Sequence, residues 1–128
     1  MAVRNGHYAF LEMNQRLLGD DGWRLWALSE PNGKAVLLDR RDGPHGDQRP
    51  PPRFALTDDG VIWTAVHDRA GVLIYELRSA RLDGSGARAL LTSPVATKQF
   101  WFPSTDPAGS RVVYATVEPD GVAFRFRT

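Results

Sequence analysis

Aromatic residues recur along this chain at a nearly constant interval of about fifty residues. Two series of three can be aligned, which are Trp26, Tyr75 and Phe124 at intervals of 49 residues, and Tyr8, Trp63 and Tyr114 at similar intervals. A period of this length indicates that one structural unit is repeated, and stacked units bury apolar surface that a single unit leaves exposed. The repeat therefore constrains the architecture of the chain more strongly than any local motif does.

The segments that carry these aromatic residues have the composition of β-strands. Residues 8–12, 63–67 and 114–118 form one set of short stretches rich in aromatic and β-branched side chains, and residues 25–28, 74–77 and 123–126 form a second set. A third element, at 33–38 and again at 86–91, follows a glycine-containing hairpin. Helical periodicity is weak. Only residues 9–18 have apolar residues at helix-like intervals, and a strand is still favoured over a helix there. The sequence predicts an all-β fold.

Glycine-containing turns separate the predicted strands. We expect turns at 20–22, 58–60, 69–71 and 119–121, where aspartate or alanine precedes a glycine that adopts positive φ without steric cost. The paired aspartates Asp58 and Asp59 are interpreted as turn residues rather than as ligands of a cation, because neighbouring turn carboxylates seldom point at one ion.

Several of these segments match the pattern of one repeat family. Residues 103–114 (PSTDPAGSRVVY) resemble the P-x-W-S-P-D-G-x-x-I-A-F signature of TolB-like, WD40-like propeller blades, and residues 52–63 do so in a compressed form. Residues 74–92 are similar to the Y-x-x-D-x-D-G-S-x-x-R-x-L-T hairpin of that family. The likeness is closer over 52–128 than over 1–51. It departs at residues 106–109, where two residues separate the turn aspartate from its glycine.

The resemblance implies four-stranded antiparallel meanders, the blades of a β-propeller. It assigns residues 7–39 to an incomplete blade of three strands, 52–92 to a full blade and 98–128 to a second incomplete blade, with a proline-rich linker at 40–51. Closed propellers need ~4–8 blades, so these two and a half blades form a partial propeller that cannot close alone. A piece of a longer protein, several copies in one ring, and a β-sandwich built from blade-like hairpins remain as alternatives.

Composition restricts the class of partner. The 128 residues fit one β-domain, and 16 basic against 15 acidic side chains leave a net charge of +1, which predicts neither nucleic acid nor membrane as a partner. Without cysteine, neither disulfides nor thiolate metal sites can form. The N-terminus does not read as a signal peptide, so the chain as given is expected in the cytoplasm, or in the periplasm or outside the cell if it is an excised fragment.

No set of residues converges on catalysis, a cofactor or a metal in the sequence. The three histidines, His7, His45 and His67, are too widely spaced for a short metal motif, and histidines at strand ends or in loops are the simpler interpretation. His67 with its neighbour Asp68 is the best candidate for a pocket at the rim. Phe100 to Phe102 indicates a strand buried on both faces, although an exposed Trp101 would suit stacking on a sugar.

The proline run at 50–52 favours a stiff extended segment, and the flanking Arg49 and Arg53 make it a candidate docking segment. The predicted binding surface therefore consists of His67, Asp68, Trp101, Arg49 and Arg53. The favoured function is a non-catalytic scaffold for protein–protein interaction, whose partner is another protein or copies of the chain that complete the ring. The alternatives are the propeller of a prolyl-oligopeptidase-type hydrolase whose catalytic domain lies elsewhere, and a carbohydrate-binding propeller.

Overall fold

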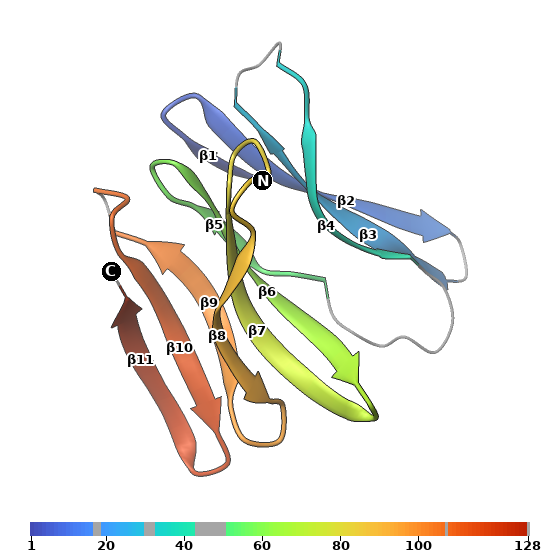
Figure 1. Cartoon of the computed structure of the whole chain (residues 1–128), viewed down its shortest axis with the longest axis vertical. Coiled ribbons are helices and arrows are strands. Elements are labelled where there is room, and N and C mark those ends of the chain that lie inside the picture. The colour runs from blue at the N-terminus through green and yellow to red at the C-terminus, as the bar shows by residue number, and fades with distance from the viewer. Residues whose placement is uncertain (17–18, 30–32, 43–50, 107, 128) are drawn as a thin grey trace.

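The computed structural model describes residues 1–16, 19–29, 33–42, 51–106 and 108–127, and the regular structure in these ranges consists of β-strands (Figure 1). The predicted all-β class is confirmed. Eleven strands form three antiparallel sheets, and in each sheet the strands pair in the order in which they follow one another in sequence. Each sheet is therefore a simple meander, joined by short hairpins.

The N-terminal sheet contains β1 (Ala2–Arg4), β2 (His7–Arg16), β3 (Gly19–Leu28) and β4 (Val36–Asp42). The middle sheet contains β5 (Phe54–Leu56), β6 (Gly60–Arg69), β7 (Val72–Arg81) and β8 (Arg88–Pro94). The C-terminal sheet contains β9 (Gln99–Thr105), β10 (Val112–Glu118) and β11 (Gly121–Arg127). The three sheets form successive layers, so the middle sheet is covered on both faces, unlike either sheet of a two-sheet β-sandwich (Figure 1).

Strand β6 shows why the middle sheet is buried on both faces. Successive side chains of a strand point to opposite faces, and Val61, Trp63 and Ala65 pack against the N-terminal sheet. The intervening Ile62 packs against Phe100 and Tyr114 of the C-terminal sheet. A strand of this kind has to be apolar at consecutive positions, which accounts for the uninterrupted run that begins at Val61.

The short first strands of the three sheets lie side by side, with β5 between β1 and β9. The hydroxyl of Thr105 in β9 donates a hydrogen bond of 2.9 Å to the carbonyl oxygen of Leu56 in β5. On the other side, Nε of Arg4 in β1 donates to Oδ1 of Asp58, just after β5, at 2.9 Å. The sheets are thus joined along their first strands as well as through their apolar faces.

The two aromatic series fall on equivalent strands of the three sheets. Tyr8, Trp63 and Tyr114 lie on the second strands, and Trp26, Tyr75 and Phe124 lie on the third strands. The hairpin predicted at 69–71 is also present, because Ala70 and Gly71 both have positive φ and join β6 to β7 with Arg69 opposite Val72.

Three boundaries differ from the prediction. The N-terminal sheet has a fourth strand, β1, outside the predicted range 7–39, because Ala2 to Arg4 pair with the start of β2. The linker predicted at 40–51 begins later, since β4 continues to Asp42 and pairs with Gly22 to Arg24; residues 43–50 lie outside the described part. The turn predicted at 20–22 is part of β3, which begins at Gly19.

Candidate functional site

Two hollows lie at opposite ends of the middle sheet. The smaller one, of about 400 Å³, opens where β6 and β7 meet and is bordered by Leu38 and Asp39 of the N-terminal sheet. The larger one, of about 750 Å³, opens at the other end, between the middle and C-terminal sheets. Both volumes fall in the range of small-ligand sites.

The smaller hollow contains a carboxylate that is nearly removed from solvent. Glu76 is 1% exposed, and both of its oxygens have cationic neighbours. Nη2 of Arg69 lies 3.0 Å from Oε1, Nη1 of Arg78 lies 2.7 Å from Oε2, and Nε2 of His67 lies 3.4 Å from Oε2. Buried carboxylates are tolerated when charged donors replace their water in this way. The two guanidinium groups therefore satisfy both carboxylate oxygens of Glu76 within the protein.

A second polar contact at the smaller hollow crosses between sheets. The indole Nε1 of Trp63, a side chain 1% exposed, donates a hydrogen bond of 2.8 Å to Oδ2 of Asp39 in β4. Asp39 thus satisfies the one polar group of a buried tryptophan. The ion pairs of Glu76 and this hydrogen bond make the wall of the smaller hollow a rigid, polar part of the interface between two sheets.

The structure does not bring the five predicted binding residues together. His67 and Asp68 both line the smaller hollow, where Oδ1 of Asp68 accepts a hydrogen bond of 2.8 Å from the backbone N–H of Gly71. Arg53 is exposed beside β6, and its backbone pairs with Thr64. Trp101 lies on a different sheet and donates from Nε1 to Oε1 of Gln99 at 2.8 Å. Arg49 lies outside the described residues.

The aromatic column beside Arg53 belongs to the core. Phe100 stacks edge-on between Tyr75 and Tyr114, with ring centroids 6.1 and 6.0 Å away. Burial raises the pKa of the Tyr75 phenol, against the smaller opposing effects of a hydrogen bond with Thr64 and the positive charge of Arg53. These rings hold the middle and C-terminal sheets together.

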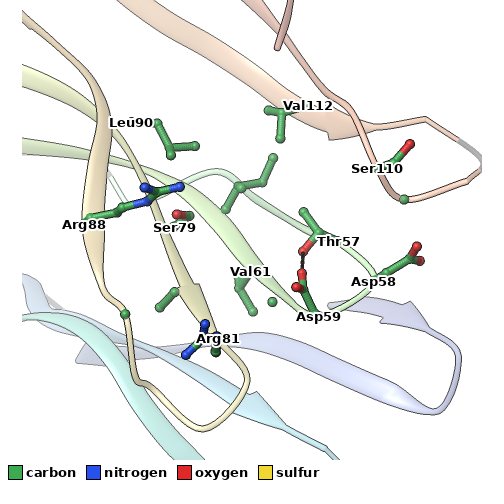
Figure 2. Close-up of a pocket in the computed structure, with 15 residues that line it drawn as sticks. Thr57, Asp58, Asp59, Val61, Ser79, Arg81, Arg88, Leu90, Ser110 and Val112 are labelled. Atoms are coloured by element: carbon green, nitrogen blue, oxygen red, sulfur yellow. Dashed lines mark hydrogen bonds between the residues drawn. The ribbon is translucent and has the colours of Figure 1, made fainter. Parts of the chain in front are cut away.

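Sequence reasoning did not find the larger hollow, which we call the arginine cleft after Arg81 and Arg88 (Figure 2). Its floor is apolar, formed by Ile62, Leu90 and Val112, and its polar groups come from four chain segments. Arg81, Arg88 and Ser79 belong to β7 and β8, Thr57 to Gly60 form the turn after β5, and Gly109 and Ser110 belong to the turn before β10. The family-like hairpin at 74–92 contains Arg88, but no local pattern distinguishes it from an ordinary strand arginine.

Three sheets meet at the rim of the arginine cleft. The carboxylate of Asp58 accepts a hydrogen bond from the guanidinium of Arg4 in the N-terminal sheet. The backbone N–H of Asp58 donates a hydrogen bond of 3.3 Å to the carbonyl oxygen of Gly109. Gly109 has a positive φ of 74°, and a Cβ at this position would contact both Asp58 and Arg4. Glycine is therefore required for this approach of the turn to the ion pair.

The turn that carries Gly109 is organised by Asp106. Oδ1 of Asp106 accepts hydrogen bonds from the backbone N–H groups of Ser110 at 2.9 Å and Arg111 at 3.1 Å. The bond from Arg111 is the main reason that the pKa of Asp106 lies below its usual value. The backbone of Ser110 and Arg111 thus closes around one carboxylate.

No protein-family model matches the chain, and the comparisons with curated proteins and with solved structures likewise find no match. The likeness to TolB-like blades therefore stays a prediction from the motifs quoted above. In the described ranges, no three histidine, aspartate or glutamate side chains gather closely enough to hold a metal ion. The same ranges contain no helix with the length and apolar character needed to cross a membrane.

Proposed function

We propose that this chain is a non-catalytic scaffold of the β-propeller type that binds protein through the outer faces of its sheet stack, and that its partner is a second copy of the chain. The observation that carries this proposal is that both outer sheets have apolar side chains on the face turned away from the core. A sheet face of this kind is stable in water when another sheet covers it.

The outer face of the N-terminal sheet follows from the strand register. Ala9 and Leu25 point into the core, so their neighbours Tyr8, Phe10 and Trp26 point outward. Directly paired residues share a face, and Tyr8 is opposite the exposed Val3, while Trp26 is opposite the exposed Leu37. This outer face therefore has an aromatic and aliphatic part, beside the ion pair of Glu12 and Arg24.

The outer face of the C-terminal sheet has a similar character. Phe100 packs inward against the middle sheet, so the next residue, Trp101, points outward, and it is paired with Ala115. At the end of the hairpin, Val117 is opposite Val122, whose side chain is 65% exposed. An exposed tryptophan and an exposed valine on one face are what a covering sheet would bury.

The arrangement inside the chain supplies the model for the contact between copies. The N-terminal sheet packs on the middle sheet, and the middle sheet packs on the C-terminal sheet with the same alignment of first strands. Placing the N-terminal sheet of a second copy on the C-terminal sheet of the first repeats this contact. Two copies with three sheets each then give six blades, within the ~4–8 that close a propeller.

The proposal is tested by measuring the solution mass of the chain by light scattering over a range of concentrations. The wild type is expected to reach twice the mass of one chain, whereas Val122→Lys and Leu37→Lys are expected to stay monomeric, because each places a charge in the contact. Val72→Lys is the matched control, since Val72 is 51% exposed but lies in the hairpin of the middle sheet. A wild-type chain that is monomeric at every concentration contradicts the proposal.

A further inference from the structure

We propose that the arginine cleft binds a peptide through a carboxylate group, which is held by Arg81 and Arg88. This site is separate from the two outer faces of the stack, so it does not depend on the proposed self-association.

The guanidinium groups of Arg81 and Arg88 form no hydrogen bond and no ion pair with any residue that the structure describes, so their N–H donors are available to a ligand. The acid nearest to Arg81 in sequence is Asp83. Its Oδ1 already accepts two hydrogen bonds from Ser85, one from the backbone N–H at 2.9 Å and one from the hydroxyl at 2.6 Å. The buried carboxylate of Glu76, which binds Arg69 and Arg78, lies at the far end of the sheet. Arg81 has an electrostatic neighbour in Asp83, but the guanidinium groups of both arginines bordering the cleft have no hydrogen-bond acceptor among the described residues.

The strand register places these donors close together. Ser79 in β7 is directly opposite Arg88 in β8 and, on its other side, opposite Ile62 in β6. Directly opposed residues share a face, and Arg81 shares it too because it lies two residues beyond Ser79, about 7 Å along the strand. Ser79, Arg81 and Arg88 thus lie on one face of the sheet, and all three line the same cleft.

The reach of the side chains agrees with this placement. Figure 2 shows Arg88 extending from β8 toward the middle of the cleft beside Ser79, while Thr57, Asp58 and Asp59 lie on the opposite side. Planar guanidinium groups bind carboxylates with two parallel hydrogen bonds, and a neighbouring hydroxyl adds a third donor. The arginine side of the cleft therefore suits a planar, singly charged anion.

The opposite wall favours a peptide carboxylate over a phosphate. The charge of Asp58 is balanced by Arg4, but Asp59 would repel a doubly charged phosphate more strongly than a carboxylate, and its carboxylate can accept hydrogen bonds from peptide N–H groups. Between the two walls, Leu90 and Val112 provide apolar surface for the rest of the peptide. A peptide whose carboxylate binds the arginines can also donate its backbone N–H groups to the acidic side of the cleft.

The site is tested on the full chain by following backbone amide chemical shifts during titration with blocked glycine–serine pentapeptides. One probe has a central glutamate, a second has a free C-terminal carboxylate and no glutamate, and a third has glutamine in place of glutamate. We expect the glutamate or the C-terminal probe to shift the amides of Ser79, Arg81 and Arg88, and the glutamine probe to leave them unmoved. The stronger of the two acidic probes identifies the source of the carboxylate.

Variants connect the shifts to the two arginines. Arg88→Gln and Arg81→Gln are each expected to weaken binding of the better acidic probe about tenfold, because each removes a charge-assisted contact. Lys98→Gln is the control, since it removes the same charge at the other end of the C-terminal sheet and should leave the affinity unchanged. Titration of Val122→Lys should give the same affinity as the wild type, which separates this site from self-association.

Three results would overturn the proposal. Binding of the glutamine probe that is as tight as binding of the better acidic probe, or no shift with either acidic probe, would show that no carboxylate is recognised. Inorganic phosphate that binds the same amides more tightly than both acidic probes, at equal ionic strength, would assign the cleft to phosphate. A Lys98→Gln loss as large as the Arg88→Gln loss would show that only net charge matters.

Discussion

The indole N–H of Trp63 in the middle sheet donates a 2.8 Å hydrogen bond to the carboxylate of Asp39 in the N-terminal sheet. Because Trp63 is buried, loss of the acceptor would leave an unsatisfied donor between two sheets. We expect Asp39→Ala to lower the free energy of unfolding by about 1–3 kcal/mol, measured by urea denaturation. Asp39→Asn retains an acceptor oxygen at the same place and should cost less than half as much. Equal losses for the two variants would contradict this assignment.

The two guanidinium groups that bind Glu76 differ in exposure, which predicts unequal contributions. Arg78 is 25% exposed and lies 2.7 Å from the carboxylate, whereas Arg69 is 65% exposed and lies at 3.0 Å. We expect Arg78→Met to cost about 1.5–3 kcal/mol, in line with a hydrogen bond to a buried charge. Arg69→Met should cost less than about 1 kcal/mol, in line with an exposed ion pair.

Both replacements retain an unbranched apolar stem, so the difference between them reports on the charged contact. Urea denaturation of the two variants in parallel gives the comparison. If Arg69→Met proves as destabilising as Arg78→Met, exposure does not control the strength of these pairs.

Gly109 and Gly71 offer a matched test of the junction between the three sheets. Both have positive φ, 74° and 83°, but a Cβ on Gly109 would contact Asp58 and Arg4, while a Cβ on Gly71 would meet no atom within 4 Å. Gly71→Ala should therefore cost only the left-handed backbone conformation, about 1–2 kcal/mol. Gly109→Ala should cost more, because the new methyl group displaces Asp58 from Arg4.

A double-mutant cycle isolates that additional cost. In an Asp58→Ala background the ion pair is already absent, so the two alanine substitutions should become nearly equal in thermal denaturation. An excess for Gly109→Ala that persists in this background would mean that the junction does not depend on Asp58.

The sequence was informative where alternation and repetition determine the structure. The aromatic period located equivalent second and third strands of the three sheets. Strand β1 was not predicted. It has only three residues, Ala2 to Arg4, and a strand this short has no periodicity of its own, so only its pairing with β2 defines it. Charged residues at the end of β4 were assigned to a linker for a related reason, since their strand conformation comes from pairing with β3.

The candidate sites were harder to foresee than the strands. The partners of Glu76 become visible once the register places His67, Arg69 and Arg78 around it. The arginine cleft depends on where the C-terminal sheet sits on the middle sheet. That placement is set by the packing of Phe100 between two tyrosines, which no spacing along the chain expresses.

The column formed by Tyr75, Phe100 and Tyr114 predicts a large effect of truncation. Tyr75→Ala should lower the free energy of unfolding by about 3 kcal/mol, because it removes a buried ring and its contact with Phe100. Tyr75→Phe retains the ring and loses only the hydrogen bond with Thr64, at a cost of about 1 kcal/mol. Thermal denaturation of both variants provides the measurement, and an unchanged melting temperature for Tyr75→Ala would contradict the strand register.

Asp106 predicts how the stability of the chain changes in acid. Backbone hydrogen bonds, the strongest from Arg111, lower the pKa of Asp106 in the folded state below the value of about 3.9 of an unfolded aspartate. The unfolded chain therefore takes up this proton at a higher pH than the folded chain does. The stabilisation from Asp106 is complete above pH ~5, and it is lost as the pH falls through the unfolded and then the folded pKa.

Urea denaturation of the wild type and of Asp106→Asn at several pH values between 7 and 2 tests this linkage. The variant should be less stable than the wild type at neutral pH, because the amide is a weaker acceptor than the carboxylate for the N–H groups of Ser110 and Arg111. The difference between the two proteins should shrink as the pH falls below about 4, where the carboxylate of the wild type becomes protonated. A difference that stays constant down to pH 2 would show that the charge of Asp106 does not contribute to the turn.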